Sequence, residues 1–282
     1  MKHFKLTNEI KVNFSGDTLW TKNFGDNTIE EWSGAIVETP DKGFFICGTK
    51  HTITPINYII KVDSLGNELF TKQYQPYSLI DEIQDVILTS DSNYIARTFD
   101  RIIKFDNNGD TIWTKELLNG VTEENSILDN NNGTFSILNS NYTITTIDNS
   151  GNVLTTKAYQ INGNSKSWIK VSNEYFVLGH NGSELNILKT NSNGDSLWTK
   201  TYSDSGILNA SASASIGFCN NSFFIVYERN IFNLELLQLN KQGDSIYSEN
   251  IPNINTENQP IKLQNFNSNS LFFICFWMLS RF

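Results

Sequence analysis

The chain has 282 residues, of which 39% are hydrophobic and 12% aromatic, enough for a substantial core. Asp and Glu total 30 against 21 Lys and Arg, and the formal net charge of -9 argues against nucleic acid or an anionic membrane as the main partner. No stretch approaches the ~18 apolar residues that a membrane-spanning helix needs. The amino terminus lacks the apolar segment of a signal peptide. We therefore expect neither a membrane span nor an export signal within this sequence.

The first complete repeat runs from Gly25 to Tyr74 and contains four short β-rich runs. These runs are residues 33–39, 44–49, 57–62 and 68–74, and they are separated by turn clusters rich in Gly, Pro and Asn. Short runs of β-branched and aromatic residues with such boundaries are typical of antiparallel strands. No window of about twelve residues shows the apolar stripe of a helix. We therefore predict an all-β chain with one four-stranded antiparallel sheet in each repeat.

One hairpin phrase recurs through the chain and sets its period. Residues 105–115 read F-D-N-N-G-D-T-I-W-T-K, and Gly109 supplies the positive φ that a tight turn between two strands requires. Matching turns occur at Gly16, Gly66, Gly151, Gly194 and Gly243. The spacings between successive turn glycines are 50, 43, 42, 43 and 49 residues. A period of about 40–50 residues made of four strands predicts the blades of a β-propeller.

The two ends of the chain each carry half of a repeat. Residues 4–13 and 18–24 match the last two strands of a repeat, and residues 259–264 and 271–276 match the first two. Two half-blades can join into one sheet that leaves no exposed edge. We therefore predict a single domain over residues 1–282, a six-bladed β-propeller closed by its terminal half-blades. The alternative is a fragment of a seven- or eight-bladed ring, which would also account for the missing export signal.

An aromatic residue occupies a fixed position after most of the hairpin turns. The residues at this position are Trp20, Phe70, Trp113, Trp198 and Tyr247, and Thr155 takes it in one repeat. They could serve as stacking platforms for sugars or bases. Because a blade cannot bury its faces alone, we instead predict that these aromatic residues are structural and pack between blades.

The repeat resembles that of a known group of propellers. The phrase Asp106-x-x-Gly109-x-x-x-Trp113 resembles the tryptophan-docking repeat of quinoprotein-type, or PQQ-like, β-propellers. The wider unit, with a Gly-aromatic-aromatic second strand and a W-T-K fourth strand, is similar to the repeat of secreted propeller proteins from Bacteroidetes. The resemblance covers residues 10–276 and implies a protein located outside the cell or at the cell surface.

The cysteines argue against a quinone cofactor. Quinoprotein dehydrogenases of this superfamily use an adjacent cysteine pair, whereas Cys47, Cys219 and Cys275 lie far apart in apolar runs. We expect them to be buried thiols that behave as small hydrophobic residues. The resemblance therefore implies the fold and no cofactor.

Acidic residues lie just before the predicted first strand in three successive repeats. They include Glu31, Asp81, Glu82, Glu123 and Glu124. First strands line the central channel of a propeller, so these carboxylates are candidates for a metal site at one mouth of that channel. Calcium suits a loose set of carboxylate oxygens. The alternative is an ordinary solvated acidic rim.

No catalytic motif accompanies these acids. The sequence has no nucleophile elbow, phosphate-binding loop or metalloprotease spacing. The leading interpretation is a non-catalytic binding or scaffolding propeller that acts as a monomer on a protein or carbohydrate ligand. The alternative is an enzyme of quinoprotein-like or glycan-cleaving type with its acids at the channel mouth. Glycan cleavage would require two carboxylates ~5–10 Å apart.

Overall fold

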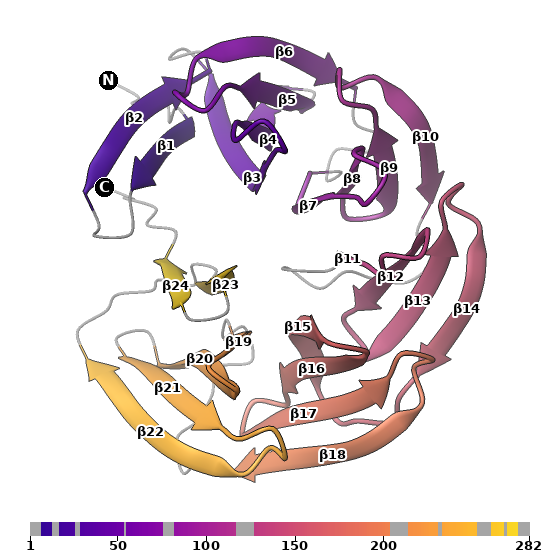
Figure 1. The fold of residues 1–282 in the computed structure, drawn as a ribbon, viewed down its shortest axis with the longest axis vertical. Coiled ribbons are helices and arrows are strands. Elements are labelled where there is room, and N and C mark those ends of the chain that lie inside the picture. The colour runs from indigo at the N-terminus through magenta and orange to yellow at the C-terminus, as the bar shows by residue number, and fades with distance from the viewer. Residues whose placement is uncertain are drawn as a thin grey trace. The chain divides into compact units, whose positions relative to one another are not determined.

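Figure 1 shows the computed structural model, which describes residues 7–12, 17–25, 29–53, 55–75, 82–116, 127–203, 214–230, 233–252, 261–267 and 270–275. These residues form 24 β-strands and no helix, so none of them belongs to a helix that could cross a membrane. The strands form five four-stranded sheets and two two-stranded sheets. The prediction of an all-β chain is confirmed.

We call the four-stranded sheets blades I to V in chain order. Blade I contains β3 (Glu30–Glu38), β4 (Phe44–His51), β5 (Ile56–Val62) and β6 (Glu68–Tyr74). Blade II contains β7 (Asp85–Leu88), β8 (Tyr94–Arg97), β9 (Arg101–Phe105) and β10 (Thr111–Glu116). Blade III contains β11 (Ile127–Asp129), β12 (Thr134–Asn139), β13 (Thr143–Asp148) and β14 (Val153–Ala158).

Blade IV contains β15 (Asn164–Val171), β16 (Glu174–His180), β17 (Glu184–Asn191) and β18 (Ser196–Ser203). Blade V contains β19 (Ala214–Cys219), β20 (Ser222–Asn230), β21 (Asn233–Leu239) and β22 (Ser245–Pro252). The two-stranded sheets pair β1 (Thr7–Val12) with β2 (Thr18–Phe24), and β23 (Ile261–Asn267) with β24 (Ser270–Cys275).

In every blade the strands lie side by side in the order in which they occur in the sequence. The four runs predicted for the first repeat correspond to β3 to β6, and β6 has the predicted bounds. Because the strands are antiparallel, the turns after the first and third strands lie at one end of the blade, which we call the turn end. The connection from second to third strand and the connection to the next blade lie at the other end, which we call the connection end.

The chain divides into two compact units. The first unit holds blades I and II, the second holds blades IV and V, and blade III contributes to both. In the first unit, blade I packs on blade II through the stacked rings of Phe45 and Tyr94, whose centroids are 3.9 Å apart. In the second unit, Phe176 of blade IV packs against Phe223 of blade V with centroids 4.3 Å apart and the rings tilted by 43°. The sixth blade and the single domain over the whole chain stay predictions.

The hairpin turn between the third and fourth strands has the same hydrogen bonds in all five blades. In blade II the Gly109 N–H donates to the carbonyl oxygen of Asp106 at 3.0 Å, and the Asp106 N–H donates to the carbonyl oxygen of Asp110 at 2.9 Å. Gly109 has a φ of 78°, a left-handed conformation that costs glycine little. This is a type I turn closed by a glycine bulge, the common three-residue hairpin loop.

The first residue of each turn holds the loop through its side chain. Oδ1 of Asp106 accepts the N–H of Asn108 at 2.9 Å and the N–H of Asp110 at 2.8 Å. Asp63, Asp148, Asn191 and Asn240 form the same pair of bonds in the other blades. Only one side-chain oxygen is needed as acceptor, so Asp and Asn are interchangeable at this position.

A second side-chain pair links the first and fifth residues of the turn. The Asn152 amide donates to Oδ2 of Asp148 at 3.0 Å, and with the roles exchanged the Asn191 amide donates to Oδ2 of Asp195 at 3.0 Å. Hydrogen bonds from Asn152, first from its backbone N–H, lower the pKa of Asp148. Each of these two turns therefore combines one carboxylate with one amide.

We call the residue four positions after each turn glycine the docking position. Four docking-position side chains pack on the turn glycine of the next blade: Trp20, Phe70, Trp113 and Trp198. The indole N–H of Trp113 donates to the carbonyl oxygen of Asn149 at 3.0 Å, and the indole N–H of Trp20 donates to that of Ser64 at 3.2 Å. A Cβ atom at Gly151 would lie 2.7 Å from Cγ of Lys115 and 3.1 Å from the Trp113 ring. The turn glycine therefore also provides the space for this contact.

The lysine two residues after the docking position reaches the same turn. Three lysines form ion pairs with the acid that follows the turn glycine: Lys72 with Asp110 at 2.5 Å, Lys157 with Asp195 at 2.7 Å, and Lys200 with Asp244 at 2.6 Å. The tyrosines Tyr74, Tyr159 and Tyr202 add a hydroxyl hydrogen bond to the glycine carbonyl of the same turns. Tyr247, at the docking position of blade V, is 48% exposed. How far the docking aromatics stabilise the fold stays a prediction.

We predict that Trp113→Ala lowers the free energy of unfolding by about 2–3 kcal/mol, because the half-buried indole loses both its packing and its hydrogen bond. Thr155, at the docking position of blade III, is exposed, and Thr155→Ser should change stability by less than about 0.5 kcal/mol. Urea unfolding of both variants measures the difference. A Trp113→Ala loss as small as that of Thr155→Ser would contradict a docking role.

Substitutions at two glycines distinguish the energetic cost of backbone strain from the cost of a steric contact. Gly133 has a φ of 77° and open space around a Cβ atom, whereas Gly151 has a φ of 78° and no such space. Gly133→Ala should cost about 1 kcal/mol of strain alone. Gly151→Ala should cost clearly more in the same unfolding experiment. Equal losses would mean that the contact with Lys115 contributes nothing.

The amide–carboxylate pair predicts a compensating double substitution. Asp148→Asn alone should lower the melting temperature, because two amide groups then face each other at the turn. Adding Asn152→Asp restores the pair in the order found at Asn191 and Asp195. The double variant should therefore melt within error of the original chain. A double variant that melts below Asp148→Asn would contradict the exchange of roles.

Candidate functional site

The structure places two of the five predicted metal-binding acids. Glu31 is buried on β3, and its Oε1 lies 2.7 Å from Nζ of Lys50, the residue directly opposite on β4. Glu82 lies before β7, with Oε1 3.7 Å from Nε2 of His51. Asp81, Glu123 and Glu124 lie outside the described residues. The charge of Glu31 is therefore already balanced by a lysine.

No metal cluster is present in the part of the chain that the structure describes. None of its groups of His, Cys, Asp and Glu places three or more side chains where they could hold one ion. Cys47 and Cys219 are buried free thiols in β4 and β19, as expected from their apolar surroundings. Burial raises the pKa of the Cys47 thiol, which makes it unreactive.

A polar layer that the sequence analysis missed lies at the connection end of the blades. In each blade a polar or charged side chain stands at or near the last residues of the second strand: Lys50 and His51 in β4, Arg97 in β8, Asn139 in β12, His180 in β16 and Glu228 in β20. Arg97, Asn139, His180 and Glu228 are buried. The signal in the sequence is a polar residue that ends each apolar second-strand run.

In the first unit this layer is made of opposed charges. Arg97 on β8 is fully buried and stands opposite the buried Asp85 on β7 in the strand register. Burial lowers the pKa of Arg97 to about 10, and the charge of Asp85 acts in the opposite direction. Glu31 and Lys50 form the equivalent pair in blade I. Opposed buried charges of this kind hold strand ends in one register, because separating them would leave a charge uncompensated.

In blades III and IV the layer contains neutral hydrogen bonds. The Ser165 hydroxyl donates to the carbonyl oxygen of Asn139 at 2.6 Å and so joins blade IV to blade III. The Thr201 hydroxyl donates to Oδ1 of Asn186 at 2.9 Å, and the Asn186 amide donates to the carbonyl oxygen of Asn162 at 3.2 Å. Asn162 belongs to the connection between the two blades, so the network fixes that connection.

The arrangement is suited to holding the strand ends from which the loops leave. A glycan-cleaving pair needs one carboxyl group that keeps its proton and one that is ionised. In the first unit, Glu31 faces Lys50 and Asp85 faces Arg97, so these two carboxylates are each compensated by a cation. Burial raises the pKa of Glu9 on β1 to about 7. The polar layer therefore supports the strand ends from which the connections leave.

Comparison with solved structures identifies the fold. Similar structures include BamB from Moraxella catarrhalis (TM-score 0.58, 13% identity, 93% of this chain and 86% of that chain) and the WD40 beta propeller domain of Doa1 (TM-score 0.62, 12% identity, 90% and 78%). A protein of unknown function from Bacteroides caccae also matches (TM-score 0.53, 12% identity, 69% and 75%). The fold is that of a β-propeller, as the repeats predicted.

Sequence comparisons add no family to this result. No family model matches the chain. No curated protein is significantly similar to it. Identities of 12–13% show the fold alone, so the resemblance to quinoprotein-type repeats rests on the residues quoted for it.

Proposed function

We propose that this protein is a non-catalytic binding or scaffolding propeller whose connection end contacts a protein or carbohydrate ligand. The observation that carries the proposal is the contrast between the two ends of the blades. The third–fourth turn at the turn end repeats the same hydrogen bonds in every blade. The connections to the next blade differ in length and composition, and a paired polar layer supports the strands from which they leave. Variable loops on a rigid repeated scaffold are the usual place for binding.

The location of the protein is part of the same proposal. The resemblance of the repeat to secreted Bacteroidetes propellers supports action outside the cell or at its surface. The net charge of -9 supports a protein or carbohydrate ligand over nucleic acid. The repeated inter-blade contacts are internal to one chain, which supports a monomer.

The enzyme alternative rests on carboxylates at the connection end. It requires a pair of acids of which one keeps its proton at neutral pH. The pairing of Glu31 with Lys50 supports the binding role instead. Assays with glycosidase substrates and with quinone-dependent alcohol oxidation separate the two classes, because any turnover above background supports an enzyme.

Replacing connections tests the binding role. We expect the purified chain to bind at least one member of an array of glycans and surface proteins. Replacing residues 204–213 with the short connection 159–163 should abolish or weaken that binding without lowering the melting temperature. Lys42→Asn, an exposed turn-end substitution, serves as the control. Binding that survives replacement of each long connection in turn would contradict a site at this end.

Calcium is the proposed ion for the acidic residues before the first strands. If Glu82 and the acids near it bind calcium, millimolar calcium should raise the melting temperature, and Glu82→Gln combined with Glu124→Gln should abolish the rise. Glu31→Gln is an informative control, since it removes the partner of Lys50 and should lower stability with or without calcium. No change in melting temperature on adding calcium would show an ordinary solvated rim.

A further inference from the structure

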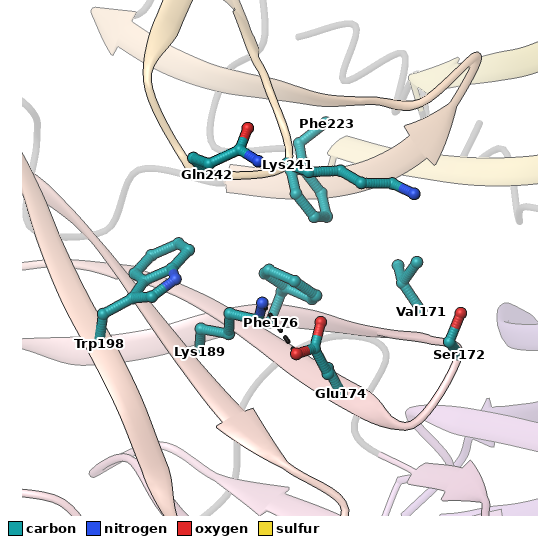
Figure 2. A pocket seen from close by; sticks show the side chains of 9 residues that line it. All are labelled: Val171, Ser172, Glu174, Phe176, Lys189, Trp198, Phe223, Lys241 and Gln242. Carbon is teal, nitrogen blue, oxygen red and sulfur yellow. Dashed lines mark ion pairs between the residues drawn. The ribbon is translucent and has the colours of Figure 1, made fainter.

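A pocket lies at the turn end of the second unit, between blades IV and V. It has a volume of about 380 Å³. Figure 2 shows three aromatic rings and three charged groups on its wall: Phe176, Trp198, Phe223, Lys189, Glu174 and Lys241. Phe176 and Phe223 are buried, while Trp198 is half-buried. The pocket is therefore framed by core side chains of two adjacent sheets.

The first unit shows how the equivalent lysine is held between blades II and III. Lys104 stands opposite the docking residue Trp113, as Lys189 stands opposite Trp198. Nζ of Lys104 pairs with Asp91 of its own blade at 2.6 Å, and it also donates to Oδ1 of Asn149, in the third–fourth turn of blade III. Its side chain is only 2% exposed. Lys104 thus forms a hydrogen bond across the junction to Asn149 in the turn of the next blade.

Lys189 does not cross the junction in this way. Its Nζ pairs with Glu174 of its own blade at 2.8 Å and lies over the ring of Phe176, also of its own blade, at 5.3 Å from the centroid. The lysine side chain is 16% exposed. By contrast, Nζ of Lys104 lies over Phe135 of the next blade at 5.5 Å. The two lysines occupy the same position in the repeat but point to different partners.

The residue in the facing turn differs between the two junctions. The turn of blade III reads Asp148-Asn149-Ser150-Gly151, and that of blade V reads Asn240-Lys241-Gln242-Gly243. Lys241 therefore stands where Asn149 accepts the bond from Lys104. An ammonium group cannot accept a hydrogen bond, and it repels a second ammonium group. Lys241 therefore offers Lys189 no side-chain acceptor across the junction.

Lys241 gives the junction a positive charge. Its Nζ lies over the ring of Phe218 at 5.6 Å, and no carboxylate of the described residues is within ion-pair distance of it. Since Glu174 already balances Lys189, the wall carries one uncompensated cation beside three aromatic rings. This combination suits an anionic head on a ring-shaped or apolar body. The net charge of -9 opposes binding of a polyanion, so a small monoanion is favoured.

We propose that the pocket between blades IV and V binds a small carboxylate carried on a ring, with Lys241 contacting the carboxylate and Trp198 packing against the ring. Two sources share this chemistry: an acidic sugar such as a hexuronate, and an aromatic acid. The site lies at the turn end and is independent of the binding role proposed for the connection end.

Calorimetric titration with D-glucuronate, benzoate and D-glucose tests the proposal on the full chain. At least one of the two acids should bind, and neutral D-glucose should bind at least tenfold more weakly than D-glucuronate where the sugar acid is the ligand. Binding of D-glucuronate alone identifies a sugar source, and binding of benzoate alone identifies an aromatic acid. The proposal is overturned if neither acid binds at millimolar concentration, or if D-glucose binds as well as D-glucuronate.

Lys241→Asn is the decisive variant because it removes the cation and installs the residue that accepts a bond from the equivalent lysine in the first unit. We expect acid binding at least tenfold weaker and a melting temperature no lower than that of the original chain, since Lys189 gains the asparagine acceptor. Lys42→Asn makes the same change in charge at an exposed turn of blade I and should leave acid binding unchanged. Acid binding of equal strength in Lys241→Asn and the original chain would overturn the proposal.

Discussion

The close approach of each fourth strand to the hairpin turn of the next blade is the contact on which the described structure depends. The approach is possible because the turn residue is a glycine, with φ between 76° and 79° in all five blades. A side chain there would be strained by its backbone and would meet the lysine or aromatic ring of the neighbouring strand. One residue type thus sets both the hairpin geometry and the distance between blades.

Polar groups also orient the fourth strand on the turn of the next blade through hydrogen bonds and ion pairs. An indole N–H, a tyrosine hydroxyl and a lysine ammonium all reach the turn of the next blade. Their acceptors are backbone carbonyls and the acid that follows the glycine, so the turn is recognised mainly through its backbone. This explains why the first residue of the turn is Asp in blades I to III and Asn in blades IV and V, since both provide the Oδ1 that accepts the backbone N–H groups.

The fold was predictable because its signals are local. Each strand is a short apolar run, each turn carries a glycine where φ must be positive, and the two alternate at a constant period.

Arg97 shows where this reasoning fails. It ends the apolar run Tyr94-Ile95-Ala96, and a run alone does not show that a buried Asp85 stands opposite it on the neighbouring strand. The same holds for Glu31: the sequence places this predicted metal ligand near a loop, but does not show that strand register sets Lys50 opposite it.

Repetition also makes single departures from the pattern informative. Among the turns that the structure describes, the second residue is Ser64, Asn107, Asn149, Ser192 or Lys241, and only the last carries a charge. In a chain without repeats, a lysine at this position would be interpreted as an ordinary surface residue. Here the lysine of the previous blade also belongs to the repeat, so Lys189 and Lys241 face the same junction, whereas Lys104 faces an asparagine. The other contacts of this junction are kept, namely the ion pair of Lys200 with Asp244 and the hydroxyl bond of Tyr202 to Gly243. The departure at Lys241 therefore adds a positive charge to the pocket wall without removing the contact that joins the blades.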